Sequence, residues 1–257
     1  MGILDQFKLD GDVAVVTGAG KGIGRSIAIG LAEAGADIVL ASRTQADLDA
    51  VAEDIAAIGG RAIAVATDAT DMAQLERLAE RAIAEFGKLT IWVNNAGGIP
   101  DATPNYLTRT TEESFDAQVT LNFKAVWMGS VIAARHMQDN GGSIVNISSR
   151  SSYGPQVKNG PYGASKAAAN SLTATLAREV APRIRVNAVA PGPTPTENFD
   201  ECMGTDDDEK RAKLLDHIGV PLRRYGSGED IAAAVVYMAS PASSWVTGQC
   251  LYVTGGL

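Results

Sequence analysis

The sequence of 257 residues predicts a single α/β domain built on a doubly wound parallel sheet of about seven strands, with helices on both faces. Short apolar runs alternate along the chain with segments whose apolar residues recur at helical spacing, which indicates repeated strand–helix–strand units. The apolar runs are near-continuous in Val, Ile and Ala, as expected for strands covered on both faces. Right-handed crossovers would place the helices on the two faces, and a chain of this length can bury a full core.

Each predicted strand is a short apolar run bounded by polar or turn residues. The first run stops at a series of glycines, and the last run ends just before Gly255 and Gly256. The fifth and sixth runs flank a long helical segment, as expected for neighbouring parallel strands. The predicted strands are residues 13–16, 37–41, 62–66, 89–93, 143–148, 184–190 and 250–253.

The segments between these strands carry apolar residues every three or four positions, which predicts helices with one buried stripe. Leu48, Val51 and Ile55 show this spacing in the second helix, and Leu75 and Leu78 begin it in the third. No internal repeat or linker interrupts the alternation, so residues 1–257 are expected to form one domain. The predicted helices are residues 23–34, 48–58, 75–86, 114–138, 161–180 and 228–239.

The composition argues against several classes of protein. The formal net charge is −8 without a basic stripe, so no nucleic-acid partner is expected. His136 and His217 lack the spacing of metal ligands, so no metal site is expected. Cys202 and Cys250 cannot form a disulfide framework, and two free thiols are typical of the reducing cytoplasm. The first ten residues show no signal peptide, which agrees with a cytoplasmic protein.

The last 27 residues, 231–257, contain no charged side chain and invite a membrane interpretation. Pro241, Thr247, Gly248 and the terminal glycines interrupt the segment, so a buried helix, a turn and a buried strand explain it better than a membrane span. Another subunit could also cover such an uncharged terminus.

A glycine series directly follows the first predicted strand and opens the first predicted helix. Glycines at Gly18, Gly22 and Gly24 would let the backbone turn tightly and approach a pyrophosphate, and the helix that starts near Ile23 offers N–H groups and a positive dipole end. In this strand–turn–helix context the series predicts a dinucleotide site of the Rossmann type.

The residues at the end of the second strand indicate which of the two dinucleotides, NAD(H) or NADP(H), the site binds. NAD sites usually place an acid there, but the strand ends in Ser42 and Arg43, and Asp37 lies at its other end. Arg43, Lys21 and the Ser42 hydroxyl could hold a 2′-phosphate, which favours NADP(H) over NAD(H). Ordinary solvated side chains would be the alternative for Lys21 and Arg43. Asp68, after the third strand, could meet the adenine or cap a helix.

Only one of the six tyrosines, Tyr162, has a lysine four residues later, at Lys166. Residues at this spacing share a helix face, and a neighbouring cation favours the phenolate over the phenol. The pair therefore predicts an acid/base catalyst, although a surface Tyr and Lys at this spacing are common.

The segment after the sixth strand is the least regular part of the sequence. It begins rich in proline and threonine and becomes acidic, and it leaves the sheet at the edge where ligands bind. Residues 191–220 are expected to form a mobile substrate loop, with a solvated surface loop as the alternative. Several apolar residues in this and an earlier loop would suit an apolar substrate or could be core packing: Tyr153, Pro155, Val157, Phe199, Met203 and Leu215.

Four ordered motifs together make the chain resemble the short-chain dehydrogenase/reductase family over its whole length. The family's TGxxxGxG, NNAG, YxxxK and PG motifs stand at residues 17–24, 94–97, 162–166 and 191–192. Each motif alone is weak, but the four at these spacings are very specific.

The resemblance implies a role for each matched residue. Tyr162 would be the acid/base, with Lys166 lowering its pKa and holding the nicotinamide ribose, and Ser149 would hold the substrate oxygen. Ser148 points to the other face, and Ser151 and Ser152 are weaker candidates. Asn122 would help hold a relay water, or be only a polar residue on a helix. The implied cofactor contacts, along the adenosine ribose and at the carboxamide, are Asn94, Asn95, Gly97, Pro191, Gly192 and Thr196.

The resemblance also implies the reaction: hydride transfer between a nicotinamide and a secondary alcohol or ketone. The chain is most similar to bacterial hydroxysteroid dehydrogenases and 3-oxoacyl-carrier-protein reductases, and a homotetramer or homodimer is expected. Enoyl reductases of this fold have a wider Tyr–Lys spacing, and extended sugar epimerases have longer chains. A non-catalytic nucleotide sensor is a further alternative, but such proteins commonly lose the Tyr, the Lys or the Ser.

Overall fold

The structure is a computed structural model that describes residues 2–100, 105–196, 199, 205 and 207–257. Within these residues the chain forms one seven-stranded sheet in the order β3-β2-β1-β4-β5-β6-β7, and every pairing is parallel. The predicted doubly wound sheet is therefore confirmed. The strands are β1 (Val13–Thr17), β2 (Asp37–Ser42), β3 (Ala62–Ala66), β4 (Ile91–Asn94), β5 (Gly142–Ile147), β6 (Ile184–Pro191) and β7 (Cys250–Val253).

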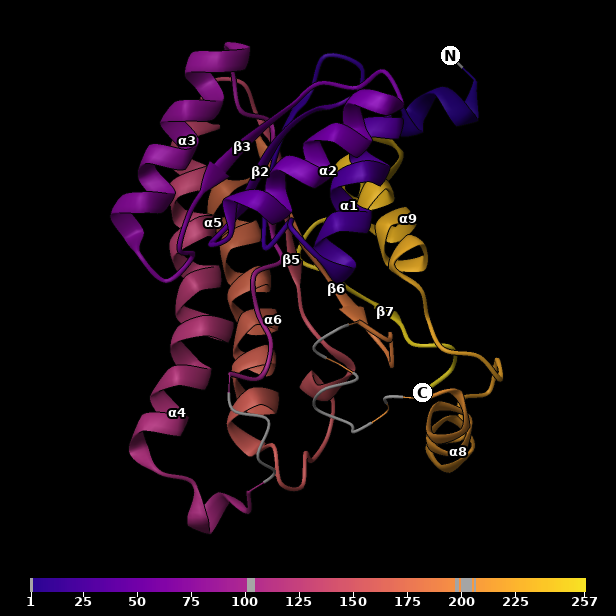
Figure 1. Ribbon diagram of the computed structural model, residues 1–257. Helices are drawn as coiled ribbons and strands as arrows, with labels where there is room; N and C mark the ends of the chain where they lie inside the picture. Colours follow the sequence, from indigo (N-terminus) through magenta and orange to yellow (C-terminus); the bar gives the residue numbers. More distant parts are fainter. Residues whose placement is uncertain (1, 101–104, 197–198, 200–204, 206) are drawn as a thin grey trace.

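The helices cover the sheet in two layers, which Figure 1 shows on either side of the strands. Alternate residues of β1 point to opposite layers: Ala14 and Val16 pack with one group of helices, and Val13 and Val15 with the other. The first layer is α1 (Gly22–Glu33), α2 (Gln45–Ala57) and α9 (Gly228–Ala239), and the second is α3 (Met72–Phe86), α5 (Ala125–His136) and α6 (Gly160–Val180).

The long helix expected over residues 114–138 is interrupted. The structure has α4 (Glu112–Val119), then a π-helical segment at Thr120–Lys124, and then α5. A π turn inserts one residue into the helical repeat and often occurs at functional sites. Here it contains Asn122, whose side chain is buried. Periodicity alone could not reveal this interruption, because apolar residues continue on both sides of it.

The segment expected as a loop over residues 191–220 contains a helix, α8 (Asp208–Ile218). Asp207 caps it by accepting a hydrogen bond from the Lys210 N–H at 2.7 Å, and Gly219 ends it in the left-handed conformation. These capping signals were present in the sequence. Residues 197–198, 200–204 and 206 of the expected loop, Cys202 and Met203 among them, lie outside the described residues.

The uncharged C-terminal segment forms helix α9, a turn and strand β7, as predicted. Contrary to the expectation of a buried strand, β7 is an edge strand and leaves Leu251 and Tyr252 partly exposed. None of the helices in the described part of the chain has the length and apolar character needed to cross a bilayer.

Candidate active site

The glycine loop lies where the winding of the sheet reverses, between the carboxyl ends of β1 and β4. Gly18 has a φ of 66°, and a Cβ on it would come within 2.9 Å of the Ala96 Cα. A Cβ on Gly24 would lie 2.1 Å from the Gly18 carbonyl oxygen. Both positions therefore exclude any larger residue. Lys21 stands at the N-cap of α1 and makes no side-chain cap hydrogen bond, so its side chain does not satisfy the first N–H groups of the helix, which are the kind of groups that bind phosphate.

Asn95 ties this loop to the end of β4. Its side-chain amide donates to the carbonyl oxygens of Thr17 at 2.9 Å and Gly18 at 3.0 Å. The Thr17 hydroxyl in turn accepts from the backbone N–H groups of Asn95 and Ala96, each at 3.0 Å. Asn95 thus shapes the cradle through its backbone partners.

Asn94 does not line the adenosine ribose with its side chain, contrary to the expectation from the resemblance. Its Oδ1 accepts from the Trp92 indole at 2.7 Å, and its Nδ2 donates to Ser130 and Asn146 at 2.9 and 2.8 Å. Asn94 is the last residue of β4, and its side chain points toward α5 in the core. It is a buried structural amide.

A cavity of about 430 Å³ opens beside the start of α1. Gly22 and Ile23 line it from the glycine loop side, and Pro195 and Thr196 line it from the segment after β6. These groups and the uncapped start of α1 fit the pyrophosphate part of a dinucleotide. The structure thus brings the glycine motif and Thr196, which are both predicted cofactor contacts, to one cavity.

The three side chains predicted to bind a 2′-phosphate, those of Lys21, Ser42 and Arg43, differ from one another in exposure and contacts. Arg43 is exposed, and the Ser42 hydroxyl lies 3.4 Å from the Thr44 carbonyl oxygen. Lys21 pairs with the Asp47 carboxylate at 3.2 Å. Asp47 also packs against the loop, because a Cβ on Gly20 would meet the Asp47 Cβ at 2.9 Å. Asp47 was not expected at the site, because it lies four residues beyond Arg43, in the first turn of α2.

Asp68 takes part in a local turn after β3. Its Oδ1 accepts from the backbone N–H of Thr70 at 2.8 Å and from the Thr70 hydroxyl at 2.7 Å. The N-cap of α3 is instead Asp71, which accepts from Ala73 and Gln74. The alternative that Asp68 itself caps the helix is therefore wrong, and a contact with adenine stays a prediction.

Tyr162 and Lys166 lie on the first turns of α6, in which Pro161 is the second residue. The Lys166 Nζ lies 5.8 Å from the centroid of the Tyr162 ring and donates a hydrogen bond to the Ile147 carbonyl oxygen at 2.8 Å. Only 3% of Lys166 is exposed. Burial lowers the pKa of its ammonium group to about 8, because desolvation disfavours the charged form.

Gly97 joins this pair to the π-helical segment. A Cβ on Gly97 would lie 3.1 Å from both the Lys166 Nζ and the Asn122 Oδ1. Asn122 is fully buried and accepts from the Gly98 N–H at 2.9 Å, while its Nδ2 donates to the Gly98 carbonyl at 2.8 Å. It also donates to Gln118. Asn122 is therefore no surface residue, and residues of three distant segments, Gly97, Asn122 and Lys166, converge here.

The four candidate serines differ in what they contact. Ser148 is buried and its hydroxyl lies 3.4 Å from the Lys166 carbonyl oxygen. Ser152 bonds to Asn170 at 2.9 Å and to the Tyr252 hydroxyl at 3.1 Å, on the side of α6 and β7.

Ser149, which follows the end of β5, is half-buried. Its Oγ accepts from the Ser151 N–H at 3.1 Å. This leaves the Ser149 hydroxyl hydrogen available for a ligand, and Ser149 remains the preferred candidate.

The segment after β6 is anchored close to the C-terminus. The Gly192 N–H donates to the Val253 carbonyl at 2.9 Å, and a Cβ on Gly192 would lie 2.7 Å from the Thr254 Cα. Position 192 therefore has no room for a side chain, because its backbone packs tightly against the residue that follows β7. The Thr196 hydroxyl accepts from the Phe199 N–H at 3.2 Å.

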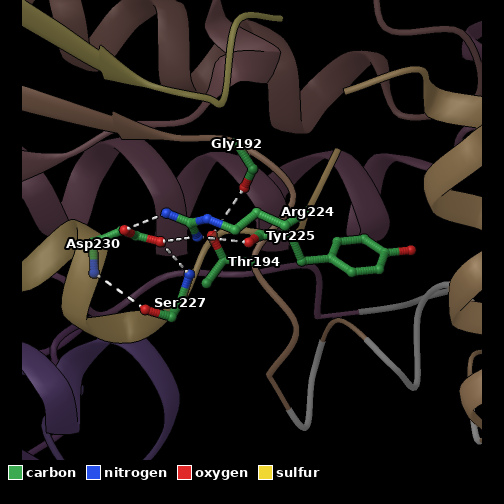
Figure 2. A network of polar contacts seen from close by, with 6 residues as sticks. All are labelled: Gly192, Thr194, Arg224, Tyr225, Ser227 and Asp230. Atoms are coloured by element: carbon green, nitrogen blue, oxygen red, sulfur yellow. Dashed lines mark hydrogen bonds and ion pairs between the residues drawn. The ribbon is translucent and has the colours of Figure 1, made fainter. Parts of the chain in front are cut away.

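A polar network fixes the connection from α8 to α9 against this segment (Figure 2). The Arg224 guanidinium donates to both Asp230 oxygens at 2.6 and 2.9 Å. Asp230 also accepts from the Ser227 N–H at 2.8 Å, which completes a capping box at the start of α9. Gly226 donates to the Pro193 carbonyl at 2.9 Å. Hydrogen bonds to Arg224 and Ser227 lower the pKa of Asp230 to about 2.

No metal site accompanies these groups in the described residues, where His, Cys, Asp and Glu side chains nowhere gather in threes around a possible ion. The site is thus a nucleotide cradle beside a tyrosine–lysine pair. Its arrangement can bind a dinucleotide and transfer a proton.

Known proteins share this architecture. A family model described as enoyl-(acyl carrier protein) reductase matches residues 18–257. An uncharacterized oxidoreductase of Mycobacterium tuberculosis is 44% identical over 99% of this chain and 95% of its own length. A 7α-hydroxysteroid dehydrogenase complexed with NADH and 7-oxo glycochenodeoxycholic acid is 38% identical, with a TM-score of 0.90 over 100% of this chain and 98% of the other.

A second solved structure, a provisionally assigned NAD(P)-dependent gluconate 5-dehydrogenase of Beutenbergia cavernae, contains NADP at low occupancy. It is 38% identical, with a TM-score of 0.88 over 98% of both chains. The family match, the similar relatives and the parallel sheet lead to one conclusion: the chain belongs to the short-chain dehydrogenase/reductase family of oxidoreductases that act on CH–OH groups.

Proposed function

We propose that this protein is an NADP(H)-dependent oxidoreductase that interconverts a secondary alcohol and a ketone, with Tyr162 as the acid/base. The observation that carries this proposal is the buried Lys166 amine, 5.8 Å from the Tyr162 ring and beside Gly97 and Asn122. Burying a charged amine costs free energy unless it is paired or hydrogen-bonded, and buried groups with a shifted pKa cluster at catalytic sites.

Four side chains of the protein would have separate roles in the reaction. A bound nicotinamide would supply or accept the hydride. In the reduction direction Ser149 and Tyr162 donate hydrogen bonds to the substrate oxygen, and the Tyr162 hydroxyl delivers its proton as negative charge develops there. Lys166 stabilises the resulting phenolate by its positive charge. Asn122 holds the backbone of Gly98 and so fixes the wall beside Lys166.

Tyr162→Phe tests this assignment. It removes one hydroxyl, so turnover should fall by about 10²–10⁴-fold, the usual contribution of general acid/base catalysis. Nucleotide affinity, measured by fluorescence titration with NADPH, should stay nearly unchanged. Tyr237→Phe, a change in α9 away from this pair, is the matched control. Unchanged turnover in the Tyr162 variant would remove this tyrosine from the mechanism.

The preference for NADP(H) over NAD(H) rests on charges at the end of β2. Arg43 is exposed there and no acid ends the strand, so a 2′-phosphate would meet a guanidinium. Solved relatives hold either NADH or NADP, so the local charges carry the argument. Arg43→Asp should lower the ratio of NADP to NAD affinity by replacing a phosphate donor with an acceptor for ribose hydroxyls. An unmoved ratio would contradict the preference.

The substrate we propose is largely apolar, such as a hydroxysteroid-like, cyclic or 3-oxoacyl ketone. Tyr153 and Val157, in the segment that follows Ser149 in the chain, are 80% and 75% exposed and offer apolar surface. Turnover of a panel that contains steroid ketones, cyclic ketones, 3-oxoacyl esters and sugar-acid ketones would test this. Activity confined to the sugar-acid members would overturn it.

A non-catalytic nucleotide sensor on the same fold is the alternative. The retained Ser149, Tyr162 and Lys166 argue against it, since a sensor needs none of them. Tight NADPH binding without turnover of any ketone in the panel would favour the sensor. We further propose that the protein acts in the cytoplasm as a homotetramer or homodimer. The exposed Trp245 and the partly exposed apolar residues of β7 support self-association.

A further inference from the structure

The hydroxyl of Ser152 joins the turn that carries Ser149 to helix α6. It donates a hydrogen bond to the Ser149 carbonyl oxygen at 2.7 Å and accepts one from the Asn170 side-chain amide at 2.9 Å. We propose that Ser152 is a positioning residue, which holds Ser149 in register with Tyr162. This inference rests on the proposed function, in which Ser149 and Tyr162 donate hydrogen bonds to the same substrate oxygen.

Asn170 extends the face of α6 that carries the tyrosine–lysine pair. Tyr162, Lys166 and Asn170 follow one another at intervals of four residues, so the three side chains lie along one stripe of the helix. Because one continuous helix carries all three, a group that is bonded to Asn170 has a set position relative to Tyr162. Ser152 therefore transmits the position of α6 to the turn after β5.

The Asn170 amide keeps this orientation although one of its two polar atoms has no partner. Its Oδ1 is buried and accepts no hydrogen bond from any of the residues that the structure describes. A buried acceptor without a donor costs stability, so packing alone does not account for an asparagine here. Its Nδ2 has two acceptors, the Ser152 hydroxyl and, at 3.4 Å, the Tyr252 hydroxyl. The shorter bond, to Ser152, is thus the main contribution of this amide.

The hydroxyl hydrogens fix the direction of these bonds. The single hydroxyl hydrogen of Ser152 goes to the Ser149 carbonyl oxygen. The Ser152 oxygen then has lone pairs for two donors, the Asn170 amide and the Tyr252 hydroxyl, which lies 3.1 Å away. Tyr252 also has a hydrogen bond with the Cys250 thiol. Asn170, which is closer, is therefore the main support of Ser152.

The turn controls where the Ser149 hydroxyl points. The Ser149 carbonyl oxygen accepts from both the N–H and the hydroxyl of Ser152, at 2.9 and 2.7 Å. The Ser149 Oγ accepts from the Ser151 N–H at 3.1 Å, and Ser149 is the N-cap of the 3₁₀ turn Arg150–Ser152. A displacement of about 1 Å at a reacting group can lower a rate about 10²-fold. Loss of the Ser152 hydroxyl should therefore reduce turnover through Ser149.

Ser152→Ala and Asn170→Leu test the inference by steady-state kinetics. Each should lower kcat about 10-fold and leave KM nearly unchanged, because an oriented donor contributes most in the transition state. The dissociation constant of NADPH should not change, since the hydrogen bonds of both side chains lie on the side of α6 and β7. Ser152→Thr keeps the hydroxyl and should restore most of kcat. Ser171→Ala, at the exposed next position of α6, is the matched control and should leave kcat unchanged.

A double-variant comparison separates positioning from a general effect on the fold. Ser149→Ala alone should lower kcat about 10²–10³-fold, as loss of a donor to a developing oxyanion does. In that background Ser152→Ala should lower kcat no further, because the group that it positions is gone. An equal loss in both backgrounds, or an unchanged kcat in Ser152→Ala alone, would overturn the inference. Unchanged turnover in Ser149→Ala alone would instead remove Ser149 from the proposed function.

Discussion

Lys166 is the residue on which the catalytic argument depends, and its burial has a measurable cost. The unfolded chain leaves this amine near its ordinary pKa of ~10.4, whereas the folded chain lowers the pKa to about 8. Between these values the unfolded state binds a proton that the folded state has released. The contribution of Lys166 to the free energy of unfolding therefore rises with pH over this window.

Comparison with Lys166→Met isolates this contribution, because all other titrating groups are common to the two proteins. The difference in free energy of unfolding, parent minus variant, should increase by about 2 kcal/mol between pH 7 and pH 9.5. Urea denaturation at the two pH values measures it. A difference that does not change with pH would show that the amine titrates normally in the folded protein.

A second prediction for a single residue concerns the effect of the Asp47 carboxylate on NADPH affinity. Its carboxylate lies 3.2 Å from the Lys21 amine and beside Gly20, where it would repel a 2′-phosphate and compete with it for Lys21. Asp47→Asn should therefore tighten NADPH binding by roughly threefold or more at low salt and leave NADH binding nearly unchanged.

Asp49→Asn is the control, since Asp49 lies on the same helix and accepts a hydrogen bond from Gln45. Weaker NADPH binding in Asp47→Asn would mean instead that the carboxylate holds Lys21 in position for the phosphate.

At the scale of elements, the join between α8 and α9 concentrates several interactions in a few residues. Asp230 serves both as the partner of Arg224 and as the carboxylate of the capping box with Ser227. Asp230→Ala removes both, so it should destabilise the protein by about 1 kcal/mol or slightly more.

Chemical denaturation at pH 7 measures this loss, and Glu53→Ala on the exposed face of α2 should cost far less. Equal effects of the two variants would show that the network adds no stability.

The elements also show which features local sequence could predict. Strands β1 to β6 and helices α1, α2, α3, α6 and α9 follow from the pattern of the sequence, because each carries a short apolar run or an apolar stripe at helical spacing. Helix α8 buries no residue, so its only signals are its caps, Asp207 and Gly219. The π-helical segment around Asn122 lies inside an apolar stretch and reflects a tertiary demand, the hydrogen bonds from Asn122 to Gly98.

For the whole molecule, the edge strand β7 suggests how chains associate. Open edge strands with apolar side chains favour pairing with other chains unless they are covered. Leu251 and Tyr252 are 36% and 39% exposed on this strand, and Trp245, just before it, is 99% exposed. In the homotetramer or homodimer that we propose, a second copy of the chain would cover these side chains.

Leu251→Asp should therefore shift the protein from tetramer or dimer toward smaller species, because a charge would be buried without a partner. Light scattering after size-exclusion chromatography measures the mass. Ile58→Asp, at the end of α2 and 48% exposed, should leave the mass unchanged. A monomeric parent protein would contradict the assembly outright.

The sequence by itself determined the parallel sheet, the glycine cradle and the tyrosine–lysine pair, because each is written in local spacing: buried runs, a turn that only glycine permits, and two residues one helical turn apart. Only the tertiary structure decided which neighbours those groups have. The Asn94 side chain points into the core, and the Asp47 carboxylate pairs with Lys21. Gly97 lies between Asn122 and Lys166, and Arg211 lines the cavity beside the start of α1. Such contacts join residues far apart in the chain, and their geometry depends on how whole layers pack.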